Sequence, residues 1–327
     1  MIHPNREAIL SAFNKTFIFF PTFQFAYSQL QRSVEATRLR QTASCSFLIG
    51  PSGSGKSRLC KLFRNSFGPP YEQVGEDGIC KVTPALYCLV ASPANIKGFC
   101  TRLLRQLGEY RHQATTAELS ENLLARLVTC KVQVMIFDEI QRLTKPDAEK
   151  TRQSTIDWLV ALLSLSKIAI ILAGDQDCNK LFTSISADSP FWRRYCYPAN
   201  LNYFDFDDNP TSELYLTLKG LDEQLYNLTK FQGDVHLYQS SIIEPLYVAS
   251  SGSLETIRLI LHEALNMSLI RNDSLIKRSD FFNACNCLLL PLNLNKKTNP
   301  FLLSQQECYD LIIKFENEKL NIPSATA

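Results

Sequence analysis

One stretch of the sequence has the residue types and spacing needed to hold a phosphate chain: the residues from Gly50 to Ser57, Gly-Pro-Ser-Gly-Ser-Gly-Lys-Ser. Its glycines let the backbone curl so that N–H groups point inward at an anion. Lys56 is placed to reach the β- and γ-phosphates of a nucleotide, and the Ser57 hydroxyl to hold Mg²⁺. The nucleotide-binding residues that we expect are Gly50, Pro51, Ser52, Gly53, Ser54, Gly55, Lys56, Ser57 and Arg58.

The segments on either side of this loop decide between a phosphate site and an incidental Gly/Ser turn. Residues 45–49 form a short apolar run of strand type, and residues 58–63 have apolar positions at helical spacing. A strand, a glycine-rich loop and a helix N-terminus follow one another, and the helix start contributes a partial positive charge. The order predicts a P-loop.

A second chemical motif is the acidic pair Asp138-Glu139, which follows an apolar strand over residues 132–137. A solvated strand end is the alternative reading, but the upstream P-loop favours a Walker B pair. Asp138 would take Mg²⁺ through its water shell, and Glu139 would polarise a water that attacks the γ-phosphate. The pair argues against a small-molecule kinase, which needs no hydrolytic glutamate. Residues 179–182 also lack the aspartate of a guanine-reading element, so ATP is the expected nucleotide.

The elements that position these motifs alternate along the chain. Apolar strands are expected at residues 45–49, 85–91, 132–139, 168–173 and 199–205, with helical segments between them. This alternation predicts an α/β fold with a five-stranded parallel sheet between helices. Ser92, followed by a proline, is expected to cap the helix over residues 94–107, and residues 68–78 to form an irregular connection.

Beyond residue 208 the pattern becomes helical throughout, as in a small all-α lid. We expect four parts: an N-terminal segment (1–28), a P-loop ATPase core (29–208), a helical lid (209–290) and a C-terminal tail (291–327) containing one more helix. Within the N-terminal segment, Pro21, Thr22 and Phe23 are candidates for the adenine side of the pocket. Packing against the core is the alternative for these residues.

Composition narrows the function classes. The chain has 327 residues and a formal net charge of +2, which gives no global affinity for nucleic acid or for an anionic membrane. Its eleven cysteines include no C-x-x-C pair, and its four histidines fall in no metal-ligand spacing, so neither zinc nor a disulfide framework is expected. No apolar run approaches the ~20 residues that span a bilayer. A cytoplasmic protein without a membrane partner is therefore expected.

With these motifs in place, the sequence resembles the AAA+ ATPases. It further resembles the TnsC/TniB regulators of Tns-type DNA transposition, most closely the TnsC of CRISPR-associated transposons in bacteria. The stretches that carry this second resemblance are His3-Pro-Asn-Arg6, Phe20-Pro-Thr22, Phe137-Asp-Glu-Ile-Gln-Arg142 and Leu172-Ala-Gly174.

The resemblance implies roles for residues outside the two motifs. Asp175, with Gln176 as the alternative, stands where AAA+ proteins place a polar sensor for the γ-phosphate. Arg193 and Arg194 stand where an arginine finger reaches the nucleotide of a neighbouring subunit, although cation–π packing is an equal alternative. The candidate DNA-backbone contacts lie on the helix after the second strand of the core: Asn95, Lys97, Thr101 and Arg102.

Taken together, these expectations describe an ATP-dependent assembly switch. ATP between subunits would close a ring or filament, with about six or seven subunits per turn, around double-stranded DNA. The resemblance implies two further partners, a transposase and a target-selection complex that is in some systems RNA-guided. The alternatives are an AAA+ helicase loader or replication initiator, and a nucleotide-gated signalling module with little turnover.

Overall fold

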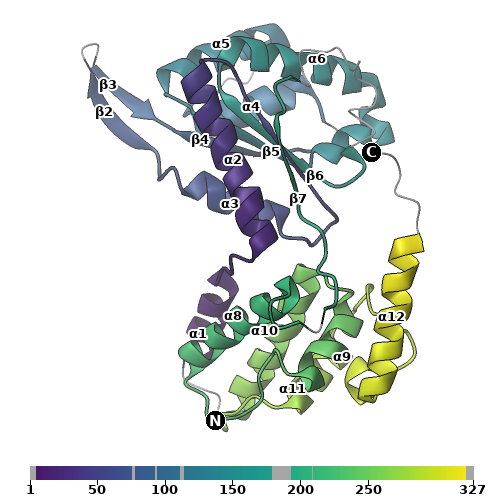
Figure 1. Ribbon diagram of the computed structural model, residues 1–327. Helices are drawn as coiled ribbons and strands as arrows, with labels where there is room; N and C mark the ends of the chain where they lie inside the picture. The colour runs from purple at the N-terminus through teal and green to yellow at the C-terminus, as the bar shows by residue number, and fades with distance from the viewer. Residues whose placement is uncertain are drawn as a thin grey trace. The chain divides into compact units, whose positions relative to one another are not determined.

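The computed structural model describes residues 5–75, 78–92, 94–110, 114–178, 193–207 and 209–321. The chain forms two compact units (Figure 1). Thr22–Asn202 make an α/β unit, and the described residues before Thr22 join those from Tyr203 onward in a helical unit.

The α/β unit contains the predicted five-stranded parallel sheet, in the order β4-β5-β6-β1-β7. Its strands are β1 (Ser46–Ile49), β4 (Ala85–Leu89), β5 (Val134–Asp138), β6 (Ala169–Gly174) and β7 (Tyr197–Asn200). The last strand was expected at residues 199–205 but begins and ends earlier. Pro198 fits there because β7 is an edge strand, where a missing N–H costs no ladder hydrogen bond.

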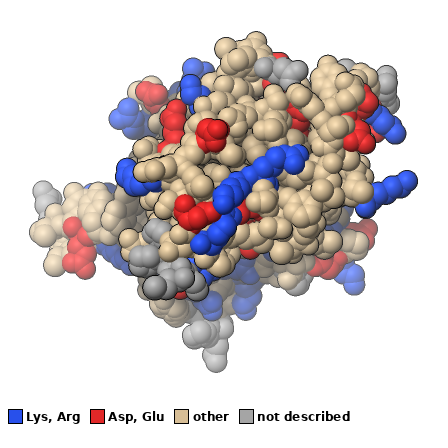
Figure 2. Space-filling view, turned by 90° about the horizontal axis from the view of Figure 1, so that it is seen from below, with Lys and Arg blue, Asp and Glu red and all other residues tan. Residues whose placement is uncertain are grey.

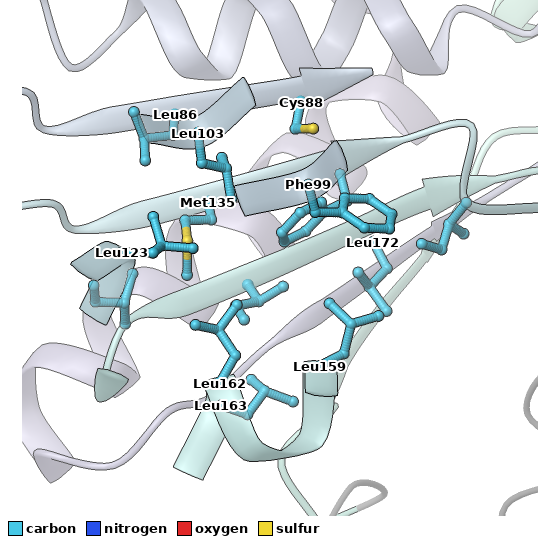
Figure 3. Packing of buried hydrophobic residues seen from close by; sticks show 14 of the residues in the cluster. Leu86, Cys88, Phe99, Leu103, Leu123, Met135, Leu159, Leu162, Leu163 and Leu172 are labelled. Carbon is cyan, nitrogen blue, oxygen red and sulfur yellow. The ribbon is translucent and has the colours of Figure 1, made fainter. Parts of the chain in front are cut away.

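Helices cover both faces of this sheet. α3 (Lys56–Asn65) packs against β4, β5 and β6, and α2 (Pro21–Arg40) lies on the same side in Figure 1. The other face carries α4 (Ile96–Gln106), α5 (Thr116–Thr129) and α6 (Glu149–Ser166). Figure 3 shows the apolar core on this face, where side chains of β4, β5 and β6 meet leucines of the three helices. This core fixes the carboxyl ends of the strands, which carry the motifs.

The start of α4 differs from the prediction. Its N-cap is Asn95, whose side-chain oxygen accepts a hydrogen bond from the N–H of Gly98 at 2.8 Å. Ser92 instead donates to the carboxylate of Asp147. Pro93 lies outside the described residues. Asparagine and serine are both good caps, so the sequence alone did not distinguish them.

Residues 68–78 are not the irregular connection that their glycines and prolines suggested. β2 (Tyr71–Gly75) and β3 (Gly78–Val82) pair as an antiparallel hairpin. Val74 and Ile79 face each other across it and are 81% and 70% exposed. Apolar and polar residues do not alternate in either strand, so the sequence carried little strand signal here.

The helical unit confirms the predicted all-α region. It contains α1 (Arg6–Lys15), α8 (Glu213–Thr229), α9 (Ser240–Ser250), α10 (Leu254–Arg271), α11 (Arg278–Cys287) and α12 (Gln305–Asn321). α1 packs against α8 and α10, and α12 packs against α9. The helix expected from residue 179 to 185 lies outside the described residues.

Surface charge is mixed on the face drawn in Figure 2, where groups of Lys and Arg lie beside Asp and Glu and most of the surface carries neither. Among the described helices, none combines the length and apolar character that crossing a bilayer requires.

Candidate nucleotide site

The P-loop leaves the carboxyl end of β1 and leads into α3, as the sequence order predicted. Gly53 and Gly55 have φ angles of 81° and 103°, which residues with a Cβ rarely adopt. Gly50 is required for another reason, because a Cβ there would lie 1.8 Å from the carbonyl oxygen of Leu201. The loop is therefore fixed against the chain that follows β7.

Lys56 is the first residue of α3, and only 6% of it is exposed. Its Nζ donates hydrogen bonds of 2.7 Å to the carbonyl oxygens of Gly50 and Pro51. Burial lowers the pKa of Lys56, while the nearby carboxylates of Asp138, Glu139 and Asp175 act in the opposite direction. These opposing effects show that the structure brings the P-loop lysine, the acidic pair and the candidate sensor into one electrostatic neighbourhood.

Asp138 ends β5 and is fully buried. Its Oδ1 accepts from the backbone N–H of Glu139 at 2.9 Å, and its Oδ2 accepts from the hydroxyl of Tyr87 at 2.6 Å. Burial and the adjacent carboxylate raise the pKa of Tyr87, so this hydroxyl stays a donor. Sequence reasoning missed Tyr87 because the contact joins two strands that are far apart in the chain.

Glu139 has a left-handed backbone, with φ 64° and ψ 37°. Its Oε2 accepts a hydrogen bond from Gln141 Nε2 at 3.1 Å and lies 3.6 Å from Arg142 Nε. Gln141 Oε1 also accepts from the N–H of Asp175 at 3.3 Å. The side chain of Gln141 thus connects the acidic pair to the end of β6. The two polar residues that follow the acidic pair in the sequence were the available signal for these contacts.

The residues of the site fit a magnesium-bound nucleotide. Ser54 Oγ is buried and has no hydrogen-bond partner among the described residues, so a polar group of the loop is left unsatisfied. Ser57 and Asp138 carry side-chain oxygens, the type of ligand that Mg²⁺ prefers. No group of three or more His, Cys, Asp or Glu that could hold a metal is found in the described part of the chain. Mg²⁺ commonly uses one or two protein oxygens together with substrate phosphates, so this donor set suits it.

The candidate sensor lies at the carboxyl end of β6, beside the P-loop. The N–H of Gly50 donates to the carbonyl of Gly174 at 3.2 Å, which ties the two segments together. The Asp175 carboxylate accepts from the N–H of Asp177 at 2.9 Å and so shapes its own turn. Gln176 is exposed in the same turn.

Arg193 and Arg194 lie at the opposite ends of the strands from the P-loop. They precede β7, whose first residue pairs with the first residue of β1, and the carbonyl of Arg194 accepts from the N–H of Cys45 just before β1. In a parallel sheet this places them at the amino ends of the strands, whereas the P-loop lies at the carboxyl ends. The structure therefore separates this pair from the nucleotide residues of the same α/β unit.

The remaining candidates occupy two helices. Pro21, Thr22 and Phe23 form the start of α2, and Phe23 is 1% exposed. The predicted DNA contacts are near the start of α4. Asn95 caps the helix, and Thr101 Oγ1 donates to the carbonyl of the exposed Lys97 at 2.8 Å.

The fourth DNA candidate, Arg102, donates to the carbonyl of Leu89 at 2.6 Å. It lines a cavity of about 670 Å³ at the carboxyl end of β4 together with Arg105 and Arg142. Arg142 donates to the carbonyl of Val90 at 2.9 Å and also approaches the Glu139 carboxylate. The structure therefore brings Arg102 near the acidic pair through a cluster of three arginines.

Comparison with solved structures shows that the fold is that of the P-loop AAA+ ATPases. The ORC2 protein of Aeropyrum pernix, solved as ADPNP–ADP complexes, is 15% identical with a TM-score of 0.59, and the match covers 88% of this chain and 72% of that one. Cdc6p of Pyrobaculum aerophilum is 13% identical with a TM-score of 0.59, covering 85% and 71%. The ORC1 protein of A. pernix in complex with DNA is 15% identical with a TM-score of 0.53, covering 99% and 84%.

Comparison with curated proteins gives no match. The family model described as "Bacterial TniB protein" matches residues 9–201, which include the P-loop, the acidic pair and the arginine pair. This range is more than half of the chain and confirms the resemblance at the level of the family. The chain belongs to the TniB family.

Proposed function

We propose that the protein is a Mg²⁺-dependent ATPase. The observation that carries this proposal is that Lys56, just after β1, and the acidic pair, at the end of β5, lie at the same carboxyl end of the parallel sheet. Bound Mg²⁺, held through Asp138 and Ser57, would supply charge neutralisation at the phosphates. The Lys56 ammonium would exchange the carbonyls of its own loop for phosphate oxygens, and Glu139 would accept a hydrogen bond from the attacking water.

The contacts of Glu139 bear on when hydrolysis occurs. Gln141 and Arg142 both contact its Oε2, which is the type of oxygen that must orient the water. A carboxylate engaged by an amide and a guanidinium is a weaker hydrogen-bond acceptor for water. The protein's own residues thus favour slow turnover until these contacts rearrange.

We further propose that the active site is completed between subunits. Arg193 and Arg194 lie at the amino ends of the strands, opposite the P-loop, which supports a role at the nucleotide of a neighbour rather than at that of their own subunit. A guanidinium supplied in trans would stabilise the transferring phosphoryl group only after assembly. ATP turnover would then report oligomerisation.

The biological role that we propose is regulation of DNA transposition. The family match supports it, and the ORC1 protein of the same fold, solved in complex with DNA, supports DNA binding. The ring or filament would mark a target site and recruit a transposase, while a target-selection complex would direct its loading. The likeness to ORC and Cdc6 proteins favours one second candidate, a replication initiator or helicase loader.

A mixing experiment tests the trans arrangement. Lys56→Ala removes the phosphate-binding amine, and the double variant Arg193→Ala/Arg194→Ala removes the proposed finger while keeping the P-loop. Each variant should be inactive alone. A mixture should regain DNA-stimulated phosphate release, because the intact P-loop of the double variant can then lie against the intact arginines of the Lys56→Ala variant. Glu149→Gln, an exposed change on α6, serves as the control and should leave turnover unchanged. Absence of recovery in the mixture, with both variants folded, would contradict the trans arrangement.

Electron micrographs test the assembly itself. Rings or filaments should form on duplex DNA with a non-hydrolysable ATP analogue and not without nucleotide. Glu139→Gln should bind ATP, fail to hydrolyse it and keep the assemblies on DNA. Pull-down with the transposase then separates the two candidate roles, since a helicase loader would instead retain a replicative helicase. Particles that stay monomeric at all concentrations would refute the proposal.

A further inference from the structure

A second cavity, of about 810 Å³, lies entirely within the helical unit. Its walls come from α8, α9, the start of α12 and the segments that precede α8 and α9. The described residues that line it are Phe206, Asp207, Tyr215, Tyr238, Ser240, Ile243, Glu244, Ser304, Gln305, Gln306 and Tyr309. Four of these carry aromatic rings, two carry carboxylates, and none of them is basic. A lining with aromatic rings and carboxylates and without a basic residue favours a flat, positively charged group.

Glu244 is the buried one of the two acidic residues that line the cavity. It lies on α9 and is 6% exposed, and its Oε1 accepts a hydrogen bond from Gln305 Nε2 at 3.0 Å. The other carboxylate, Asp207, is exposed. Because a carboxylate shielded from water interacts strongly with an incoming opposite charge, Glu244 makes the cavity selective for cations.

Three of the four rings contact other aromatic rings of the helical unit. Tyr238 lies 5.3 Å from Tyr215, centroid to centroid, and stacks at 5.3 Å on His236. His236 is in turn fixed by Asp222, whose Oδ2 lies 2.8 Å from its Nδ1. Phe206 packs edge-on against the fully buried Tyr247, with ring centroids 5.3 Å apart. These rings do not need to be ordered on binding, which reduces the entropic cost of filling the cavity.

We propose that this cavity receives an arginine side chain presented by a partner protein. A planar guanidinium can stack on the tyrosine rings and donate to the Glu244 carboxylate at the same time, which a compact ammonium does less well. The volume exceeds that of one side chain and leaves room for flanking residues. At the rim, the exposed amides of Gln305 and Gln306 can bond a peptide backbone. None of the residues that line the cavity belongs to the nucleotide site.

Two blocked peptides test the proposal on the full chain: Gly-Leu-Arg-Leu-Gly, and the same peptide with citrulline, which keeps the shape of arginine but is neutral. Calorimetry or NMR titration should give saturable binding of the arginine peptide at least tenfold tighter than that of the citrulline peptide. Glu244→Gln should reduce the affinity for the arginine peptide tenfold or more. Tyr309→Leu, which removes a ring that is 42% exposed, should reduce it severalfold.

The matched control is Glu318→Gln, which removes an exposed carboxylate from the far end of α12 and should leave the affinity unchanged. Lys56→Ala should also have no effect, which separates this interaction from the ATPase proposal. If Glu244→Gln does not fold, Asp207→Asn and Tyr309→Leu carry the test, because both residues are exposed. Equal binding of the two peptides, equal loss in the control, or no saturable binding at a concentration of several millimolar would overturn the proposal.

Discussion

The left-handed backbone of Glu139 predicts that glycine is more stable than alanine at this position. A residue with a Cβ loses about 1–2 kcal/mol in this conformation, whereas glycine loses little. Glycine also lowers the free energy of unfolding by about 0.5–1 kcal/mol relative to alanine, because the unfolded chain gains conformational freedom. The net expectation is that Glu139→Gly is about 0.5–1 kcal/mol more stable than Glu139→Ala, since neither variant has the carboxylate.

The carboxylate contributes a separate, smaller amount. Its contacts are the hydrogen bond from Gln141 and the ion pair with Arg142, both partly exposed, together worth on the order of 1 kcal/mol. Glu139→Ala should therefore be less stable than wild type, and Glu139→Gly close to it. For an α/β unit of this size the Gly–Ala difference corresponds to a rise of about 1–4 °C in melting temperature.

Differential scanning calorimetry of the full-length variants measures this difference, with ATP turnover followed in parallel. Both variants should lose hydrolysis, so activity cannot explain a difference in stability between them. The same pair of substitutions at Glu149, whose backbone is helical with φ −54° and ψ −46°, should give the reverse order, with alanine the more stable. If Glu139→Gly melts at or below Glu139→Ala, the backbone at this position is not strained and the reasoning fails.

Three further predictions concern the same unit. Tyr87→Phe removes a hydrogen bond to the buried aspartate and should cost about 1.5–3 kcal/mol in urea unfolding and reduce turnover; unchanged values would remove the tyrosine from the site. Gly50→Ala should abolish nucleotide binding and cost about 3 kcal/mol or more, because its Cβ would meet the Leu201 carbonyl; retained calorimetric ATP binding would contradict this. Burial raises the pKa of Cys45 from 9.0 to about 12, so iodoacetamide at pH 8 should label the exposed Cys196 before Cys45. Because the Cys45 thiol loses its proton more easily in the unfolded chain, it should lower the free energy of unfolding as the pH rises above about 9. Rapid labelling of Cys45 in the folded protein would refute this prediction.

Much of the architecture could be predicted from the sequence because its signals are local. Buried parallel strands appear as apolar runs, and Lys56 and Asp138 stand at fixed offsets from such runs. The hairpin was missed because glycine and proline between residues 68 and 78 indicated a loop, and neither strand alternates apolar and polar residues. The choice between Ser92 and Asn95 as helix cap depended on tertiary contacts that no local pattern encodes.

The contacts around the acidic pair could not be predicted for a different reason. Tyr87 reaches Asp138 only because β4 and β5 are neighbours, with Leu89 paired to Asp138. Gln141 joins Glu139 to Asp175 because β5 and β6 are also neighbours. Strand order is a global property of the sheet, so a list of motifs names the reacting groups but not the side chains that restrain them.

The pairing of β1 with β7 has a mechanical consequence. At one end of this pair the Leu201 carbonyl leaves no room for a Cβ at Gly50, and at the other the Arg194 carbonyl accepts a hydrogen bond from the N–H of Cys45. Only four residues of β1 separate the two ends, so the strand pair can transmit a movement from one end to the other as a short rigid element. In the ring that we propose, a movement of the P-loop on nucleotide binding would be transmitted through this strand pair to Arg193 and Arg194, and would couple hydrolysis in one subunit to the state of the next.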